Sequence, residues 1–355
     1  MITERTITTQ CGTKFRAIDN GAPAKADYLT LVFLHGWGMP SAAGIAHRIA
    51  EAAHEKGVRF VGINRRGYAG STPYSQEEER VFAEGSSDER NILYRHEGRH
   101  YAYLLDALIK DHTIGKGGAA LIAWSAGNAY LSTTIDAIND VPGEVRERLS
   151  SAVNAFIYYG TSPVLFLVCA ILTRPSDPPP EALAIPRPQL YTPATDESIP
   201  PADRWSTHLA WFASYFNHDL TSRDEKGLGT RPDPSRTPTD KVDRFYEDLC
   251  EMSGAIPGDA NIIGPDFAPF VRAARDSAFF SEKTWKAWGE PRISYVWAGA
   301  TVWMMVYGAW AMEDLVKKNK PPTEIPFKVI EQGNHYVSAG RRVVPRSAND
   351  YTVAL

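Results

Sequence analysis

The sequence predicts an α/β fold in which helices flank a mainly parallel sheet. From residue 1 to 160, short apolar runs alternate with longer amphipathic ones, as strands and crossover helices do. The same alternation returns over residues 286 to 355. Residues 161 to 285 break it, because they are rich in proline and aromatic side chains. We therefore expect one core domain, 1–160 plus 286–355, with a lid or cap inserted after its sixth strand.

The clearest expected strand is Leu29–Leu34, a continuous apolar run typical of a strand buried on both faces. The strands are expected at Thr6–Thr9, Thr13–Ile18, Leu29–Leu34, Val58–Ile63, Ala119–Trp124, Ala152–Tyr159, Arg292–Trp297 and Ile325–Ile330. The helices are expected at Ile45–Lys56, Asp88–Asp111, Gly127–Asn139, Asp203–His218, Lys241–Met252, Ala268–Phe279 and Met304–Lys318.

Composition and charge exclude several classes of partner. The net charge is −4 with no long basic run, which argues against nucleic acid. The apolar stretch Tyr295–Met312 has Arg292 and Glu313 against its ends, so we expect a buried strand and helix and no membrane span. The N-terminus lacks a secretory signal, and the three cysteines are scattered. These features predict a cytoplasmic protein; no dinucleotide or phosphate motif is present, and we expect no cofactor.

A candidate nucleophile lies in the stretch LIAWSAGNAYL, residues 121–131. An apolar strand there ends in Ala-Trp-Ser-Ala-Gly and a helix begins, which is the arrangement that presents a serine on a sharp strand-to-helix turn. The small residues Ala123 and Gly127, two before and two after Ser125, allow the backbone to bend tightly. Ser125 is therefore the expected nucleophile.

Two loops supply the expected partners of Ser125. Residues 34–38, Leu-His-Gly-Trp-Gly, follow an early strand, and such a loop gives one backbone N–H of an oxyanion hole. By position the two donors are the N–H groups of Trp37 and Ala126, with His35 and Gly36 as neighbouring pocket residues. After the last expected strand comes Gly-Asn-His, which places His335 as the base.

The segments LVFLHGWG, FVGINRRGYAGS, LIAWSAGNAYL and GNHYV together resemble the α/β-hydrolase superfamily in order and spacing. The resemblance covers the core and implies the α/β-hydrolase fold with a serine nucleophile. The Asn-Arg-Arg-Gly-Tyr stretch is similar to the loop after the fourth strand in epoxide-hydrolase-like members and many fungal relatives. Epoxide hydrolases need an aspartate nucleophile, so Ser125 argues against that activity.

The sequence lacks an acid at both positions where the resemblance implies one. After the seventh strand the family pattern G-x-x-D is matched by 299–302, with Val302 in the acid position. After the sixth strand the chain has Gly160 and a threonine. Asp219 and Glu331 are the remaining candidates. A Ser–His pair without an acid is the alternative, and loss of the acid lowers turnover by several powers of ten.

The insertion indicates the kind of substrate. Its aromatic residues include Trp211 and Tyr215, which are expected to line an apolar pocket or to attach the lid to the core. Trp124 adds apolar bulk beside Ser125. A medium-sized hydrophobic small molecule is the expected partner. The oligomeric state is left open.

Three functions remain compatible with these residues. The first is a serine hydrolase acting on an ester, lactone or thioester through a covalent acyl-enzyme. The second is a cyclase, lyase or isomerase of small-molecule (secondary) metabolism, in which His335 is the acid or base. The third is a binding protein that has lost its chemistry. His96 and His100 are four residues apart and could place two imidazoles on one helix face, but the charged residues around them, Glu97 among them, indicate a solvated face and no metal site.

Overall fold

The structure is a computed structural model, and its description covers residues 2–38, 40, 44–160, 188, 190–238, 261–262 and 264–336. Within these residues eight strands form one sheet in the order β1-β2-β4-β3-β5-β6-β7-β8. The pairs β1–β2 and β2–β4 are antiparallel, and the remaining pairs are parallel. The strands are Thr3–Thr8, Lys14–Asp19, Thr30–Leu34, Arg59–Ile63, Ala119–Trp124, Val153–Tyr159, Arg292–Ala298 and Phe327–Ile330, β1 to β8 in chain order.

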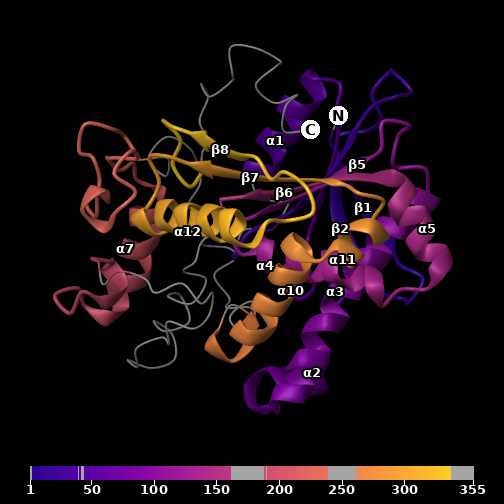
Figure 1. Ribbon diagram of the computed structural model, residues 1–355, viewed down its shortest axis with the longest axis horizontal. Helices are drawn as coiled ribbons and strands as arrows, with labels where there is room; N and C mark the ends of the chain where they lie inside the picture. The colour runs from indigo at the N-terminus through magenta and orange to yellow at the C-terminus, as the bar shows by residue number, and fades with distance from the viewer. Residues whose placement is uncertain are drawn as a thin grey trace.

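Helices cover both faces of the sheet (Figure 1). Helix α1 lies on one face, and α3, α4, α10 and α12 lie on the other. The helices are α1 (Gly44–Glu55), α2 (Gln76–Glu84), α3 (Ser87–Lys110), α4 (Gly127–Asp136), α5 (Gly143–Ala152), α7 (Pro201–Ala213), α10 (Ala268–Phe280), α11 (Glu282–Ala287) and α12 (Trp303–Asn319). This is the mainly parallel sheet with flanking helices that the sequence predicts.

Strand β3 shows why the central strands carry apolar residues in succession. Val32 and Leu34 belong to the larger core, with residues of α3 and α4. Phe33 points the other way, into a smaller core with Phe60 beside α1. Successive side chains of a strand face opposite sides of the sheet, so a strand covered by helices on both faces must be apolar throughout.

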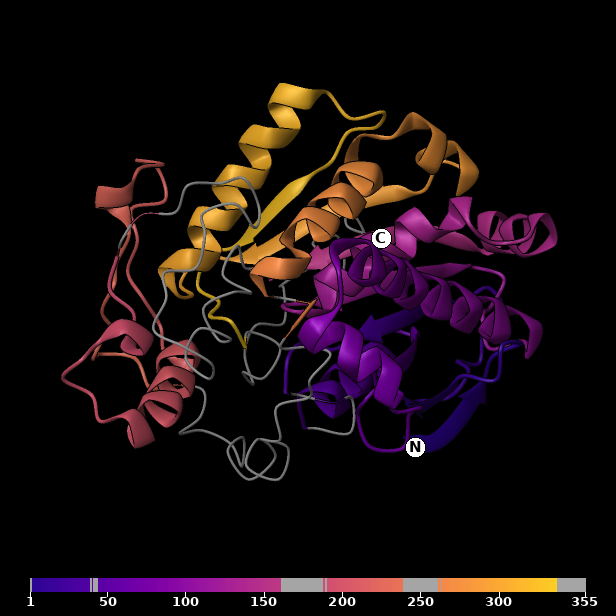
Figure 2. The same cartoon turned by 90° about the horizontal axis from the view of Figure 1, so that it is seen from below.

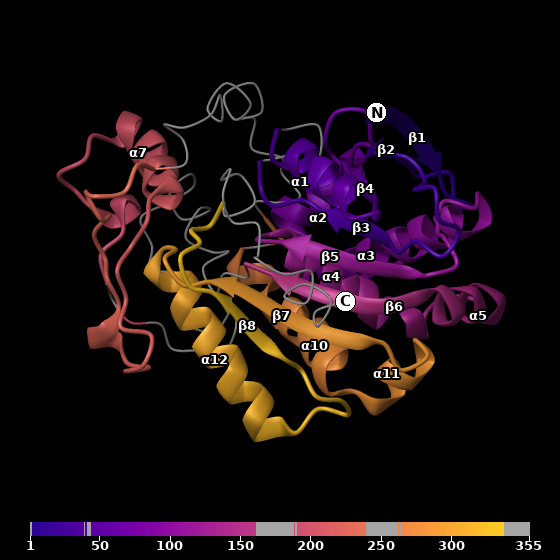
Figure 3. The same cartoon turned by 90° about the horizontal axis from the view of Figure 1, so that it is seen from above.

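The segment 190–238 lies beyond the carboxyl ends of the parallel strands, with α7 at its centre (Figures 2 and 3). Its attachment to the core is polar as well as apolar. The Nε2–H of His218 donates to the carbonyl of Thr301 at 2.7 Å, and the indole N–H of Trp303 donates to the carbonyl of Tyr191 at 2.9 Å. Arg223 forms ion pairs with Glu313 and other groups of α12. The carboxyl ends of parallel strands are where ligands bind in α/β folds, so this segment lies over the expected site.

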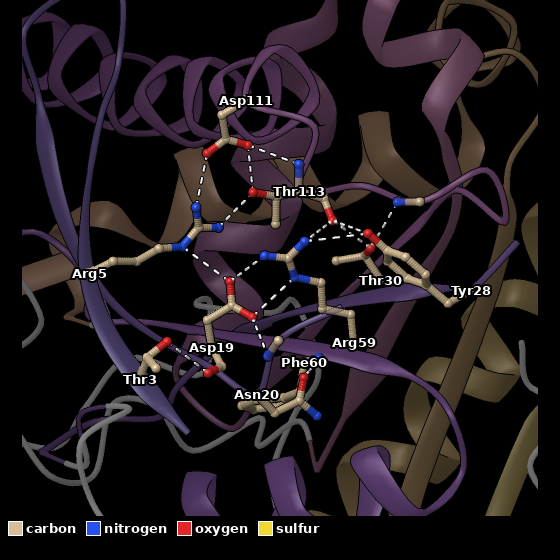
Figure 4. A network of polar contacts seen from close by, with 12 residues as sticks. Thr3, Arg5, Asp19, Asn20, Tyr28, Thr30, Arg59, Phe60, Asp111 and Thr113 are labelled. Carbon is tan, nitrogen blue, oxygen red and sulfur yellow. Dashed lines mark hydrogen bonds and ion pairs between the residues drawn. The ribbon is translucent and has the colours of Figure 1, made fainter. Parts of the chain in front are cut away.

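A polar network lies at the opposite end of the sheet, where the parallel strands begin (Figure 4). Asp19 is 2% exposed, and its carboxylate accepts hydrogen bonds from Arg59 at 3.1 and 2.8 Å. The Nε of Arg5 lies 3.2 Å from the same carboxylate. Arg59 also donates to the carbonyl of Thr113 at 3.0 Å. These contacts connect β1, β2 and β4 with the loop that leads into β5.

Replacing Asp19 by alanine should lower the free energy of unfolding by about 3 kcal/mol, because it leaves the partly buried guanidinium of Arg59 without a carboxylate and leaves Arg5 with Asp111 alone. Urea unfolding measures this as a lower midpoint. Glu4→Ala is the matched control, because Glu4 forms an exposed ion pair with Arg16 on the neighbouring strand, which is expected to contribute less than about 1 kcal/mol. Equal effects of the two substitutions would contradict the role assigned to Asp19.

Most expected elements are present, and most of their ends lie within three residues of the expected positions. The apolar stretch Tyr295–Met312 is β7 followed by α12, as expected, and no described helix is long and apolar enough to cross a membrane. The helix expected over Asp203–His218 is shorter and ends at Ala213. Helix α5 was not expected, because its charged sequence buries only Val145 and Leu149. The helix expected at 241–252 lies outside the described residues.

Candidate functional site

Ser125 lies at the turn between β5 and α4 and has the backbone conformation of a nucleophile elbow. Its φ is +52°, a left-handed conformation that costs a non-glycine residue about 1 kcal/mol or more. Its N–H donates to the carbonyl of Tyr159 at 3.0 Å. Asn128 donates to the carbonyl of Ser125 from its backbone N at 3.1 Å and from Nδ2 at 2.9 Å. Bonds from β6 and from the first turn of α4 therefore hold the strained residue in place.

Glycines allow the loop after β3 to lie against this elbow. A Cβ on Gly127 would meet backbone carbonyl oxygens of that loop at 2.6 and 2.8 Å. A Cβ on Gly36 would lie 3.0 Å from the ring of Trp124 and 3.2 Å from the Cβ of Ser125. The predicted oxyanion loop is thus in direct contact with the predicted nucleophile.

His35 lies inside that loop and holds its shape. It is fully buried, and its Nε2 accepts the backbone N–H of Arg65 at 3.1 Å. The ring proton is therefore on Nδ1, which donates to the carbonyl of Gly36 at 2.7 Å. Both ring nitrogens are used in shaping the loop. Trp37 is half-buried in it, and Ala126 is buried at the start of α4.

His335 follows β8 and is enclosed by aromatic rings. Its ring centroid lies 5.2 Å from that of Trp124, 5.3 Å from that of Phe212 in α7, and 5.1 Å from that of Tyr336. The indole N–H of Trp124 donates to the carbonyl of His335 at 3.3 Å. Trp124, the residue before Ser125, is therefore in direct contact with the predicted base. A Cβ on Gly160, at the end of β6, would lie 3.8 Å from Cε1 of His335.

The imidazole of His335 has no acidic partner among the described residues. Its Nδ1 is buried without a hydrogen-bond partner. Burial lowers the pKa of His335 to about 3, because no neighbouring charge offsets the desolvation of the imidazolium. The apolar ring contacts explain this shift.

Neither candidate acid found in the sequence fills this position. The carboxylate of Asp219 is exposed and accepts hydrogen bonds from the backbone N–H and hydroxyl of Thr221 at 3.0 and 2.6 Å, inside its own turn. Glu331 is exposed at the end of β8. Val302, in the position that the resemblance implies for the acid, is fully buried at the start of α12. Within the described chain the pair Ser125–His335 has no third member.

Of the aromatic residues in the insertion, Trp211 and Tyr215 have partners within the segment 190–238, whereas Phe212 also contacts His335. Trp211 is buried against Phe212 and Phe216, and its indole N–H donates to the carbonyl of Thr230 at 3.3 Å. It also lines a cavity of about 250 Å³ within the segment 190–238, together with Tyr191 and Arg231. Tyr215 is covered by the guanidinium of Arg236 at 3.6 Å. Among the described residues, the rings that enclose His335 are those of Trp124, Phe212 and Tyr336, and the sequence alone does not single out the last two.

The charged face of α3 is solvated only in part: His96 is exposed as expected, whereas Glu97 is fully buried. Its carboxylate pairs with the buried guanidinium of Arg66, which also binds Glu78 at 2.8 Å. Burial raises the pKa of Glu97 to about 7. Oxygens of Glu78 and Glu97 and a nitrogen of His100 lie within 4.8 Å of one another, but the guanidinium bonded to both carboxylates already supplies the positive charge there. This cluster is an internal ion-pair network.

Neither a known family model nor a curated protein matches the sequence. Among solved structures, a laboratory-evolved variant of potato epoxide hydrolase is similar, with a TM-score of 0.50, 16% identity, and coverage of 96% of this chain and 95% of that chain. Epoxide hydrolase A from Mycobacterium thermoresistibile gives a TM-score of 0.47 at 17% identity over 100% and 98% of the two chains. The thioesterase domain from the curacin biosynthetic pathway gives 0.44 at 12% identity over 96% and 95%.

Identities this low bear on the fold alone. The chain has the α/β-hydrolase fold.

Proposed function

We propose that the chain is a serine hydrolase that cleaves an ester, lactone or thioester of a medium-sized hydrophobic small molecule. One observation carries the proposal: Ser125 is held at φ +52° on the β5–α4 turn, and the ring of its neighbour Trp124 contacts the predicted base, His335. A strained serine on this turn presents its hydroxyl at the sheet edge.

The proposed reaction has two steps. The Oγ of Ser125 attacks the acyl carbon while His335 takes the hydroxyl proton, and the N–H groups of Trp37 and Ala126 stabilise the oxyanion. The alcohol or thiol leaves with that proton, which gives an acyl-enzyme. Water, deprotonated by His335, then attacks the same carbon and releases the acid and free Ser125.

The walls of the site support a hydrophobic substrate. Trp124, Phe212 and Tyr336 surround the base with apolar surface, and Phe212 belongs to the predicted lid, residues 161–285. Such walls exclude water from the reacting atoms and bind apolar groups. We propose that this lid covers a core formed by 1–160 and 286–355. Helix α10, within the same range, packs against α4 of the core.

Nitrophenyl esters of increasing acyl length test the proposal. An acyl-enzyme should give a burst of about one nitrophenol per chain, followed by slower turnover, and medium-length acyl groups should react faster than acetate. Ser125→Ala should show no burst and a much slower steady-state turnover. Hydrolysis at equal rates by wild type and Ser125→Ala would contradict the proposal.

The pH dependence of this hydrolysis should lack the usual acidic limb. A histidine base acts only when neutral, so an ordinary group with a pKa of 6.5 loses activity below that pH. Because burial lowers the pKa of His335 to about 3, the imidazole stays neutral and kcat/KM should be flat from about pH 8 to about pH 5. Nitrophenol release, followed at its isosbestic wavelength, measures the profile. A half-maximal rate near pH 6.5 would show that His335 is solvated or paired with an acid.

A second candidate function is favoured by the unpartnered Nδ1 of His335. A carboxylate at Nδ1 fixes the tautomer that a serine hydrolase needs, and without one the imidazole serves other proton transfers equally well. A cyclase, lyase or isomerase would use His335 in that way. Turnover that survives Ser125→Ala and is lost in His335→Ala would identify this class.

A further inference from the structure

A buried arginine lies behind the loop that adjoins Ser125. Arg65 follows β4 and is 0% exposed. Its Nε donates to the carbonyl of His35 at 3.1 Å, and its Nη2 donates to the carbonyl of Gly36 at 3.1 Å. The guanidinium also lies over the ring of Tyr130, 4.3 Å from its centroid. Burying a charged group costs free energy. A buried guanidinium that binds two backbone carbonyls of one loop therefore indicates that the conformation of this loop matters.

The carbonyl of Gly36 has two donors, which fix the orientation of its peptide. One is Nη2 of Arg65, and the other is Nδ1 of His35 at 2.7 Å. In a trans peptide the C=O and N–H groups point in opposite directions. The N–H of this peptide belongs to Trp37, so it points away from Arg65. The peptide adjoins the nucleophile, because a Cβ on Gly36 would lie 3.2 Å from the Cβ of Ser125.

We propose that Arg65 is a positioning residue that orients the N–H of Trp37 as an oxyanion donor. This inference rests on the proposed hydrolase function. A charge-assisted hydrogen bond holds a carbonyl more firmly than a neutral one, and it polarises the peptide so that its N–H is a better donor. Tyr68 continues the arrangement: its hydroxyl accepts from Nη2 of Arg65 at 3.3 Å and from the N–H of Gly38 at 2.9 Å.

Two reactions at position 125 separate this role from a merely structural one. Phosphonylation of Ser125 by a fluorophosphonate develops negative charge on the phosphoryl oxygen and needs the oxyanion donors. Alkylation of Ser125→Cys by iodoacetamide needs none. In Arg65→Met, phosphonylation should be about 100-fold slower. In Ser125→Cys carrying Arg65→Met, alkylation at position 125, followed by peptide mapping, should change by less than about threefold.

Matched variants complete the test. Arg65→Lys keeps the charge but cannot bridge two carbonyls, so its phosphonylation rate should be intermediate. Arg95→Met removes an exposed arginine that pairs with Asp140 and should leave both rates unchanged. Equal loss of both reactions in Arg65→Met, or phosphonylation within about threefold of wild type, overturns the proposal.

Two further readouts keep the inference decidable. If Arg65→Met does not fold, Tyr68→Phe replaces it, and an unchanged phosphonylation rate there overturns the proposal. If wild type is not phosphonylated at all, the hydrolase function fails, and a crystal structure of Arg65→Met decides the positioning role separately. A rotated Gly36–Trp37 peptide supports it, and an unchanged peptide contradicts it.

Discussion

Ser125→Ala should abolish the acyl-enzyme burst and lower ester hydrolysis by about 100-fold. In a complete triad, loss of the serine costs about 10⁶-fold and loss of the acid alone about 10⁴-fold. His335 has no acidic partner in the described chain. The wild type should therefore already be slower than a complete triad by about the 10⁴-fold that loss of the acid costs. The remaining difference between wild type and Ser125→Ala is therefore about 100-fold, as measured by steady-state kcat/KM.

Ser125→Gly is the matched control for the backbone. It also removes the hydroxyl, so its activity should equal that of Ser125→Ala. It relieves the left-handed strain at φ +52°, so it should raise the free energy of unfolding by about 1 kcal/mol, which urea unfolding measures. A loss near 10⁶-fold in Ser125→Ala would instead show that the wild type has a complete triad.

Gly160→Asp should raise kcat/KM by about 100-fold, because it supplies the carboxylate that His335 lacks. A Cβ at this position would lie 3.8 Å from Cε1 of His335, so a carboxylate one bond further can approach the imidazole. The backbone there has φ +55°, which aspartate tolerates better than most residues. The nearby negative charge should also raise the pKa of His335, and an acidic limb should reappear in the pH profile.

Gly160→Asn is the control with the same shape and no charge. It should leave kcat/KM near the wild-type value and should not restore the acidic limb. The two substitutions also predict a coupling: in the Gly160→Asp background, Ser125→Ala should cost about 10⁴-fold instead of about 100-fold. Equal rates for the aspartate and asparagine variants would show that the carboxylate does not act through His335.

The fold and the positions of Ser125 and His335 could be predicted because their signals are local. A buried strand ending in a serine between small residues specifies the turn after β5, and a histidine after the last strand is placed by chain order. The strand order then brings both to the carboxyl edge of the sheet.

The side-chain contacts around Ser125 and His335 could not be predicted, because they depend on the direction in which each side chain points. Arg65 and Arg66 are neighbours in sequence, yet one donates to the carbonyls of the loop after β3 and the other pairs with Glu97. Nothing in their types distinguishes them. Phe212 is one of several aromatic residues in α7, and only the packing of that helix brings it, and not Tyr215, against His335.

The most direct test of the central claim is the mass of the wild-type chain after treatment with a fluorophosphonate. An activated Ser125 predicts a single covalent adduct, which peptide mapping places on residue 125 and which Ser125→Ala and His335→Ala both prevent. A folded wild-type chain that gains no adduct, or one modified at a different serine, would contradict the assignment of Ser125 and His335 as the reacting pair.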